Sequence, residues 1–277
     1  MKVNVLGLIF AAQRLETAAG RLQALKPAAL APLAADGTSL GASGRLDAAS
    51  TALLASTTAQ VASLHTAAFH LLLIAAKFAT QEEINKANLD SLNIQANALD
   101  DGALSTLDPV PPLAPDVRLP LPPLPPIAGE LFSQQIHNGS ASRGVDFATT
   151  ATNNGSAIDA VAITVREVAA SVPDYWDSPV GTEALAGRLN EYVANLNTIS
   201  DRWLELGDEA RKHTDDYSET VSATPKPQDF MDTRDRLNQA LAAKNPIAAS
   251  QANTDLGMLD GRARAEATRY AGVTETT

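Results

Sequence analysis

The sequence predicts an all-α protein, an elongated antiparallel helical bundle in which a helical hairpin precedes a second helical domain. Apolar residues recur every three or four positions over most of the 277 residues, which is the period of an amphipathic helix. Hydrophobic residues make up 45% of the chain but aromatic residues only 4%, so Leu, Val, Ile and Ala must fill a core between closely packed helices. No segment shows the alternation of apolar and polar residues that is typical of a strand.

The first domain, residues 1–102, is predicted to be a helical hairpin. Its first helix carries an apolar stripe spaced by three and four: Leu8, Ala11, Leu15, Ala18, Leu22 and Leu25. Residues 36–44 are rich in Gly, Ser and Thr and predict a turn. The same spacing resumes at about Arg45 and continues to Leu99, which predicts a second helix about 80 Å long.

A proline-rich linker is predicted over residues 103–127. Nine of the 16 prolines lie between Pro109 and Pro126. Because proline fixes φ and lacks a backbone donor, we expect this segment to be extended and to separate two domains.

The second domain, residues 128–277, predicts several helices separated by clear breaks. A short helix over 128–137 ends at Asn138-Gly139, and the helix that contains the next valine stripe is expected to stop at Pro173. Residues 174–181 then form a turn, and Thr182 is a candidate N-cap for a long helix. Further breaks are expected at Thr224-Pro225 and Asn245-Pro246, before a last helix towards Tyr270.

Charge and composition argue against several classes of function. The formal net charge of −11 repels phosphate backbones, so we expect no nucleic-acid partner. The chain has no cysteine, its four histidines show no metal-ligand spacing, and no catalytic motif is present, so we expect no catalytic residues, cofactor or metal. The most apolar later run, residues 67–76, is about half the length of a spanning helix, so membrane contact is possible but not indicated by the sequence.

The chain also resembles a known group of secreted proteins. The end of the second helix carries an aromatic-x-x-x-acid pair, Phe78 and Glu82, and such a pair shares one helix face. This layout resembles the PE domain of mycobacterial proteins. Trp176 at a helix–helix turn, followed five residues later by Gly181, resembles the Trp-x-Gly turn of PPE and WXG proteins, where the spacing is two. With its Thr-Pro and Asn-Pro breaks, the chain is most similar to EspB-type substrates of mycobacteria and related actinobacteria, in which both halves are fused.

The resemblance implies a non-enzymatic protein that a type VII (ESX) secretion system exports to the medium or the cell surface. It implies recognition by the secretion machinery and a cytoplasmic chaperone, and assembly into a ring-like homo-oligomer after export. The apolar run at residues 5–12 is short and soon meets Arg14, so we expect no cleavable Sec signal peptide. The expected export signal combines Phe78, Glu82, Trp176 and Gly181 at one end of the bundle.

Two other interpretations remain open from the sequence. The chain could be the N-terminal delivery domain of a larger secreted toxin or enzyme, or a cytoplasmic coiled-coil scaffold. Phe78 also continues the apolar stripe of its helix and could simply belong to the core. Trp176 could serve only to cap the end of the bundle.

Overall fold

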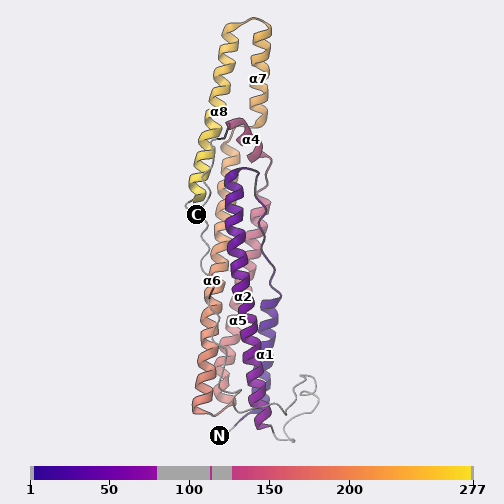
Figure 1. The fold of residues 1–277 in the computed structure, drawn as a ribbon, viewed down its shortest axis with the longest axis vertical. Coiled ribbons are helices and arrows are strands. Elements are labelled where there is room, and N and C mark those ends of the chain that lie inside the picture. Colours follow the sequence, from indigo (N-terminus) through magenta and orange to yellow (C-terminus); the bar gives the residue numbers. More distant parts are fainter. Residues whose placement is uncertain (1–2, 80–112, 114–126, 276–277) are drawn as a thin grey trace. The chain divides into compact units, whose positions relative to one another are not determined.

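The computed structural model describes residues 3–79, 113 and 127–275 (Figure 1). Their helices, in chain order, are α1 (Val5–Gln23), α2 (Gly37–Phe78), α4 (Gly129–His137), α5 (Ser142–Tyr175), α6 (Pro179–Ala223), α7 (Pro227–Ala242) and α8 (Pro246–Glu275). The described residues form no strand, and an isolated antiparallel bridge joins Val3 to Trp176. The predicted all-α fold class is confirmed.

The chain divides into two compact units. Of the described residues, unit 1 holds 3–27, 52–79, 113 and 152–204, and unit 2 holds 28–51, 127–151 and 205–275. Helices α2, α5 and α6 therefore contribute residues to both units.

The core of unit 1 is built mainly from Leu, Val, Ile and Ala. Helix α1 buries the stripe Val5, Leu8, Ile9, Ala11, Ala12, Leu15, Ala18, Ala19 and Leu22. Helix α6 adds two large aromatic side chains, Tyr192 and Trp203, which are both fully buried. Close approach between helices also depends on glycine, because a Cβ atom at Gly155 of α5 would lie 2.9 Å from Cγ of Leu204.

The predicted turn at residues 36–44 is wrong, because α2 already begins at Gly37. The Asp36 carboxylate accepts a hydrogen bond from the Ser39 backbone N–H at 2.9 Å, which satisfies one of the free amides at the helix start. Small side chains then pack inside unit 2, where Ser39, Ala42 and Ser43 are buried. The Gly, Ser and Thr residues therefore reflect close packing of a helix and not a turn.

The boundaries around the α5–α6 turn also differ from the prediction. Helix α5 continues past Pro173 to Tyr175, because the proline is exposed and interrupts only one backbone hydrogen bond. Helix α6 begins at Pro179, where a missing N–H costs nothing. Thr182 is therefore not the N-cap, and the Ser178 hydroxyl takes that place by accepting the Gly181 N–H at 3.2 Å.

Other predicted boundaries are confirmed. The short helix is α4, and the breaks before α5, α7 and α8 fall at the predicted Asn-Gly, Thr-Pro and Asn-Pro pairs. The predicted continuation of the second helix to Leu99 and the proline-rich linker at 103–127 lie outside the described residues.

Helix α2 is the one described helix whose length and composition would allow it to cross a membrane. Its most apolar window has a mean hydropathy of 1.5, and 50% of that window is buried. A core helix meets the same criteria, so this finding alone does not indicate a membrane span.

We predict that Gly139→Ala lowers the stability of the protein by about 1–3 kcal/mol. A Cβ atom at this loop position would lie 2.2 Å from the Leu33 carbonyl oxygen and 2.4 Å from the Tyr217 hydroxyl. Gly257→Ala in α8 is the matched control, because its Cβ would meet nothing within 4 Å and alanine favours a helix by about 0.5–1 kcal/mol. Denaturant midpoints followed by circular dichroism measure both effects, and equal midpoints would contradict the packing argument.

Candidate functional site

The turn between α5 and α6 in unit 1 is closed by side chains from its own residues. The Thr182 hydroxyl donates to the Trp176 carbonyl oxygen and accepts a hydrogen bond from the Ser178 N–H at 3.3 Å. The Thr182 N–H in turn donates to the Ser178 carbonyl oxygen at 2.9 Å. The backbone around Trp176 is therefore held in a defined conformation.

The indole of Trp176 lies against Gly181 in the first turn of α6. A Cβ atom at Gly181 would lie 2.2 Å from Cη2 and 2.6 Å from Cζ2 of the indole. The absence of a side chain at this position is therefore a steric requirement, and the five-residue spacing still brings the tryptophan and the glycine into contact. The indole Nε1 is buried without a hydrogen-bond partner among the described residues.

The N-terminal segment is attached to the same turn. The Asn4 N–H donates to the Tyr175 carbonyl oxygen at 2.7 Å, next to the bridge between Val3 and Trp176. The Asn4 side chain caps α1 by accepting the Gly7 N–H at 3.0 Å. A Cβ atom at Gly7 would lie 2.3 Å from the Tyr175 ring, so this glycine also allows close contact.

Sequence reasoning missed this N-terminal contribution. Asn4 before an apolar run is a typical N-cap, and Gly7 interrupts an otherwise apolar first turn. Asn4 indicates where the helix starts, and Gly7 indicates that another segment packs closely against its first turn. Neither residue could identify that segment, because Tyr175 lies far away in the sequence.

The structure brings together two of the four predicted export residues, Trp176 and Gly181. Phe78 is the last residue of α2 and is half-buried. Figure 1 shows the C-terminal end of α2 at the same end of unit 1 as the N-terminus and the α5–α6 turn. Glu82 lies outside the described residues.

Unit 2 contains a separate buried polar cluster. The Tyr270 hydroxyl lies 3.2 Å from the Ser39 hydroxyl, and the Tyr270 ring stacks on His213 with a centroid separation of 5.8 Å. Burial, reinforced by the nearby charge of Arg45, lowers the pKa of His213 to about 4, and burial raises the pKa of Tyr270. An acid–base catalyst needs a pKa near the working pH, so these shifts favour a structural role.

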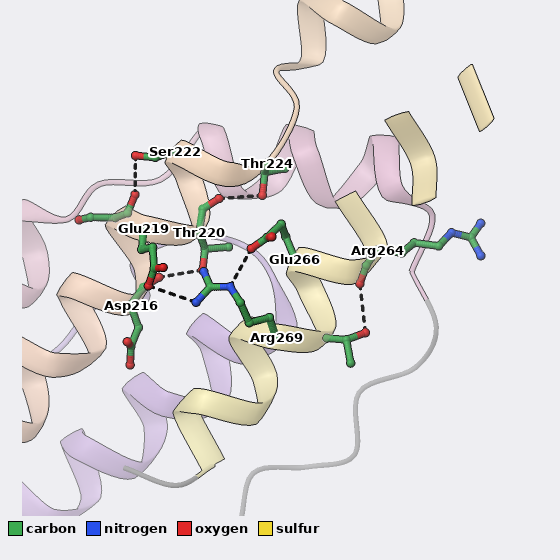
Figure 2. Close-up of polar contacts among 10 residues, drawn as sticks. Asp216, Glu219, Thr220, Ser222, Thr224, Arg264, Glu266 and Arg269 are labelled. Carbon is green, nitrogen blue, oxygen red and sulfur yellow. Dashed lines mark hydrogen bonds and ion pairs between the residues drawn. The ribbon is translucent and has the colours of Figure 1, made fainter. Parts of the chain in front are cut away.

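A partly buried polar network joins α8 to α6 in the same unit (Figure 2). The Arg269 guanidinium donates to the Glu266 carboxylate at 2.8 Å, the Glu219 carboxylate at 3.2 Å and the Thr220 hydroxyl at 3.1 Å. The hydrogen bond to Glu266 raises the pKa of Arg269. These contacts link the last turns of α6 to α8.

The described residues offer no group of three His, Cys, Asp or Glu side chains arranged to hold a metal ion. An open hollow of about 560 Å³ between α7 and α8 is lined by Asp229, Asp232, Thr233, Arg236, Asp255, Met258, Leu259 and Arg262. Arg236 in this hollow forms an ion pair with Asp255 at 3.2 Å. Its charged groups thus neutralise one another in part.

No protein-family model matches the sequence, and no curated protein matches it. Among solved structures, the chain is similar to EspB of Mycobacterium marinum, with 12% identity, a TM-score of 0.62, and coverage of 95% of this chain and 91% of that one. It is also similar to EspB from the ESX-1 type VII secretion system, with 13% identity, a TM-score of 0.62, and coverage of 95% and 92%. A third match, described as a mycobacterial protein, has 13% identity and a TM-score of 0.60, with coverage of 95% and 90%. The chain thus has the EspB fold, and the predicted resemblance is confirmed at that level.

Replacing Gly181 by alanine should displace the Trp176 indole and lower stability by about 1–3 kcal/mol. Acrylamide quenching of tryptophan fluorescence should increase, because the other tryptophan, Trp203, is fully buried and contributes little to quenching. Gly187→Ala in the same helix is the control, since a Cβ there would meet nothing within 4 Å. Unchanged quenching in Gly181→Ala would show that the indole does not depend on this contact.

Stability should fall as the pH drops from about 6.5 to about 4, because His213 is held neutral in the fold and is protonated more readily in the unfolded chain. The loss from this group is about 3 kcal/mol at the acid end, and none is expected above its ordinary pKa. His213→Phe keeps a ring beside Tyr270 and should weaken the pH dependence of the denaturation midpoint. His65→Gln, at an exposed histidine, is the control. The same pH profile in wild type and His213→Phe would exclude His213 as the cause.

Proposed function

We propose that the protein is a substrate of a type VII (ESX) secretion system and acts outside the cytoplasm as a non-enzymatic structural or interaction protein. The observation that carries this proposal is the likeness to EspB over 95% of the chain, since one of those structures is described as EspB from the ESX-1 type VII secretion system. Fold alone does not fix function, so the proposal also needs a site that could be recognised.

The proposed recognition site is the end of unit 1 that carries the α5–α6 turn. Trp176 and Gly181 form a preorganised turn there, and Phe78 ends α2 at the same end (Figure 1). Glu82, four residues after Phe78 in the sequence, is the fourth proposed component. The Trp176 side chain is half-buried, so part of its large apolar surface is available for recognition by another protein.

The remaining parts of the proposal rest on the resemblance and the N-terminal pattern described in the sequence analysis. A cytoplasmic chaperone accompanies the protein before export, no Sec signal peptide is removed, and the exported protein assembles into a ring-like homo-oligomer. Residues 1–102 act as a PE-like hairpin, 103–127 as a linker and 128–277 as a PPE-like bundle. A high content of acidic residues supports solubility of the monomer at neutral pH, since the formal net charge is −11.

Secretion from a type VII-competent host tests the recognition site. We expect wild type in the culture filtrate, and Trp176→Ala and Glu82→Ala folded but retained in the cell pellet. Glu191→Ala is the control, because this carboxylate is exposed and forms a surface ion pair with Arg188 that contributes about 1 kcal/mol or less. A cytosolic marker protein monitors lysis. Wild-type amounts of both variants in the filtrate would rule out this site as the export signal.

A further inference from the structure

Two large apolar side chains on α1 point away from the core of unit 1. Leu6 is 60% exposed and Phe10 is 56% exposed, whereas Leu8 and Ile9 between them are buried. Because they are four residues apart, Leu6 and Phe10 share one face of the helix. Val180, in the first turn of α6, is 80% exposed. Scattered exposed apolar residues are ordinary on a protein surface, so their position decides whether they matter.

The position of Leu6 and Phe10 is set by the attachment of the N-terminal segment to the α5–α6 turn, which carries Trp176. The bridge between Val3 and Trp176 fixes the chain three residues before Leu6. The hydrogen bond from Asn4 to Tyr175 and the contact of Gly7 with the Tyr175 ring hold the first turn of α1 in place. Leu6 and Phe10 are therefore carried on a helix whose start is fixed to the turn.

Val180 is attached to the same turn from the other side. It directly precedes Gly181, against which the Trp176 indole lies. The first turn of α1 and the first turn of α6 are thus both attached to the turn that carries the half-buried Trp176. We call Leu6, Phe10, Trp176 and Val180 the turn-end surface.

Among the described residues, the charged groups close in sequence to the turn-end surface are mainly acidic. Between Glu167 and Arg188 the charged residues are Asp174, Asp177 and Glu183, which are all exposed, and there is no Lys, Arg or His. In α1 no charged residue precedes Arg14, whose guanidinium is paired with Glu167. The last turn of α2 contributes a single base, Lys77.

We propose that the turn-end surface is a docking site for a protein partner that presents an apolar side chain surrounded by Lys and Arg. The proposal rests on the proposed function and identifies the partner as a component of the export machinery. A lipid surface fits less well, since bacterial membranes carry anionic lipids that the carboxylates repel. A second copy of the chain fits less well too, because a two-fold contact through this surface would set the same three carboxylates against each other. The N-terminal segment acts as a positioning element for this surface.

Export of the full chain from a type VII-competent host tests the apolar part. The double variant Leu6→Ser/Phe10→Ser should reduce the amount in the filtrate roughly tenfold or more, as expected for loss of central apolar contacts. Phe69→Ser/Ile163→Ser is the matched control, because these two residues are 50% and 44% exposed on other helices of unit 1. The control variant should reach the filtrate in the same amount as wild type. Circular dichroism and the thermal midpoint establish that both variants are folded.

Charge reversal tests the acidic part. Asp174→Lys/Asp177→Lys should reduce export, whereas Asp159→Lys/Asp201→Lys, which makes the same charge change at exposed positions elsewhere in unit 1, should not. If both double variants at the turn-end surface are exported as wild type, this inference is wrong while the proposed function stands. If wild type itself is not exported, the proposed function fails and this inference with it.

Two further measurements test whether a membrane or a second copy of the chain binds the turn-end surface instead of a protein partner. Purified protein is floated with vesicles of phosphatidylglycerol and phosphatidylethanolamine, and its mass is measured by light scattering. We expect Leu6→Ser/Phe10→Ser to behave as wild type in both. Vesicle binding or self-association that this variant abolishes would assign the surface to a membrane or to a second copy and would overturn the proposal.

Discussion

The contact between the Trp176 indole and Gly181 is the constraint on which the arrangement of unit 1 at this end depends. An indole can lie on the first turn of α6 only where that turn lacks a side chain, because a Cβ atom would overlap the ring. Once the indole is placed, the backbone of Tyr175 and Trp176 is presented for pairing with Asn4 and Val3. Segments that are far apart in the sequence are thereby joined at one turn.

A core with few aromatic residues makes such close contacts necessary throughout the chain. Small side chains fill little volume, so helices must approach closely, and positions such as Gly144 and Gly155 of α5 allow this in the two units. Many serine and threonine hydroxyls on the helices donate to the carbonyl oxygen four residues earlier, as Thr57 and Thr214 do. These hydroxyls are thus satisfied within their own helix and can be buried without a partner from another helix.

The sequence predicted the fold class and most breaks, because apolar periodicity and proline or glycine pairs act locally. Sequence prediction failed where packing between distant segments overrides a local pattern. The Gly, Ser and Thr run at 37–44 predicts a turn but is helical, because small residues pack there. Pro173 predicts a helix end but is tolerated within α5, because it is exposed. For the candidate site, the pairing of Trp176 with Gly181 could be predicted from a resemblance. The contribution of Val3, Asn4 and Gly7 could not, since a contact with Tyr175 spans most of the chain length.

Export by a type VII machine is tested by expressing one protein in two strains that differ only in that machine. The wild-type chain is expressed in a type VII-competent actinobacterium and in the same strain without the ATPase of that system. At equal expression, we expect the protein in the culture filtrate of the competent strain and in the cell pellet of the deficient strain. Equal amounts in both filtrates, or retention in both strains, would contradict export by that machine.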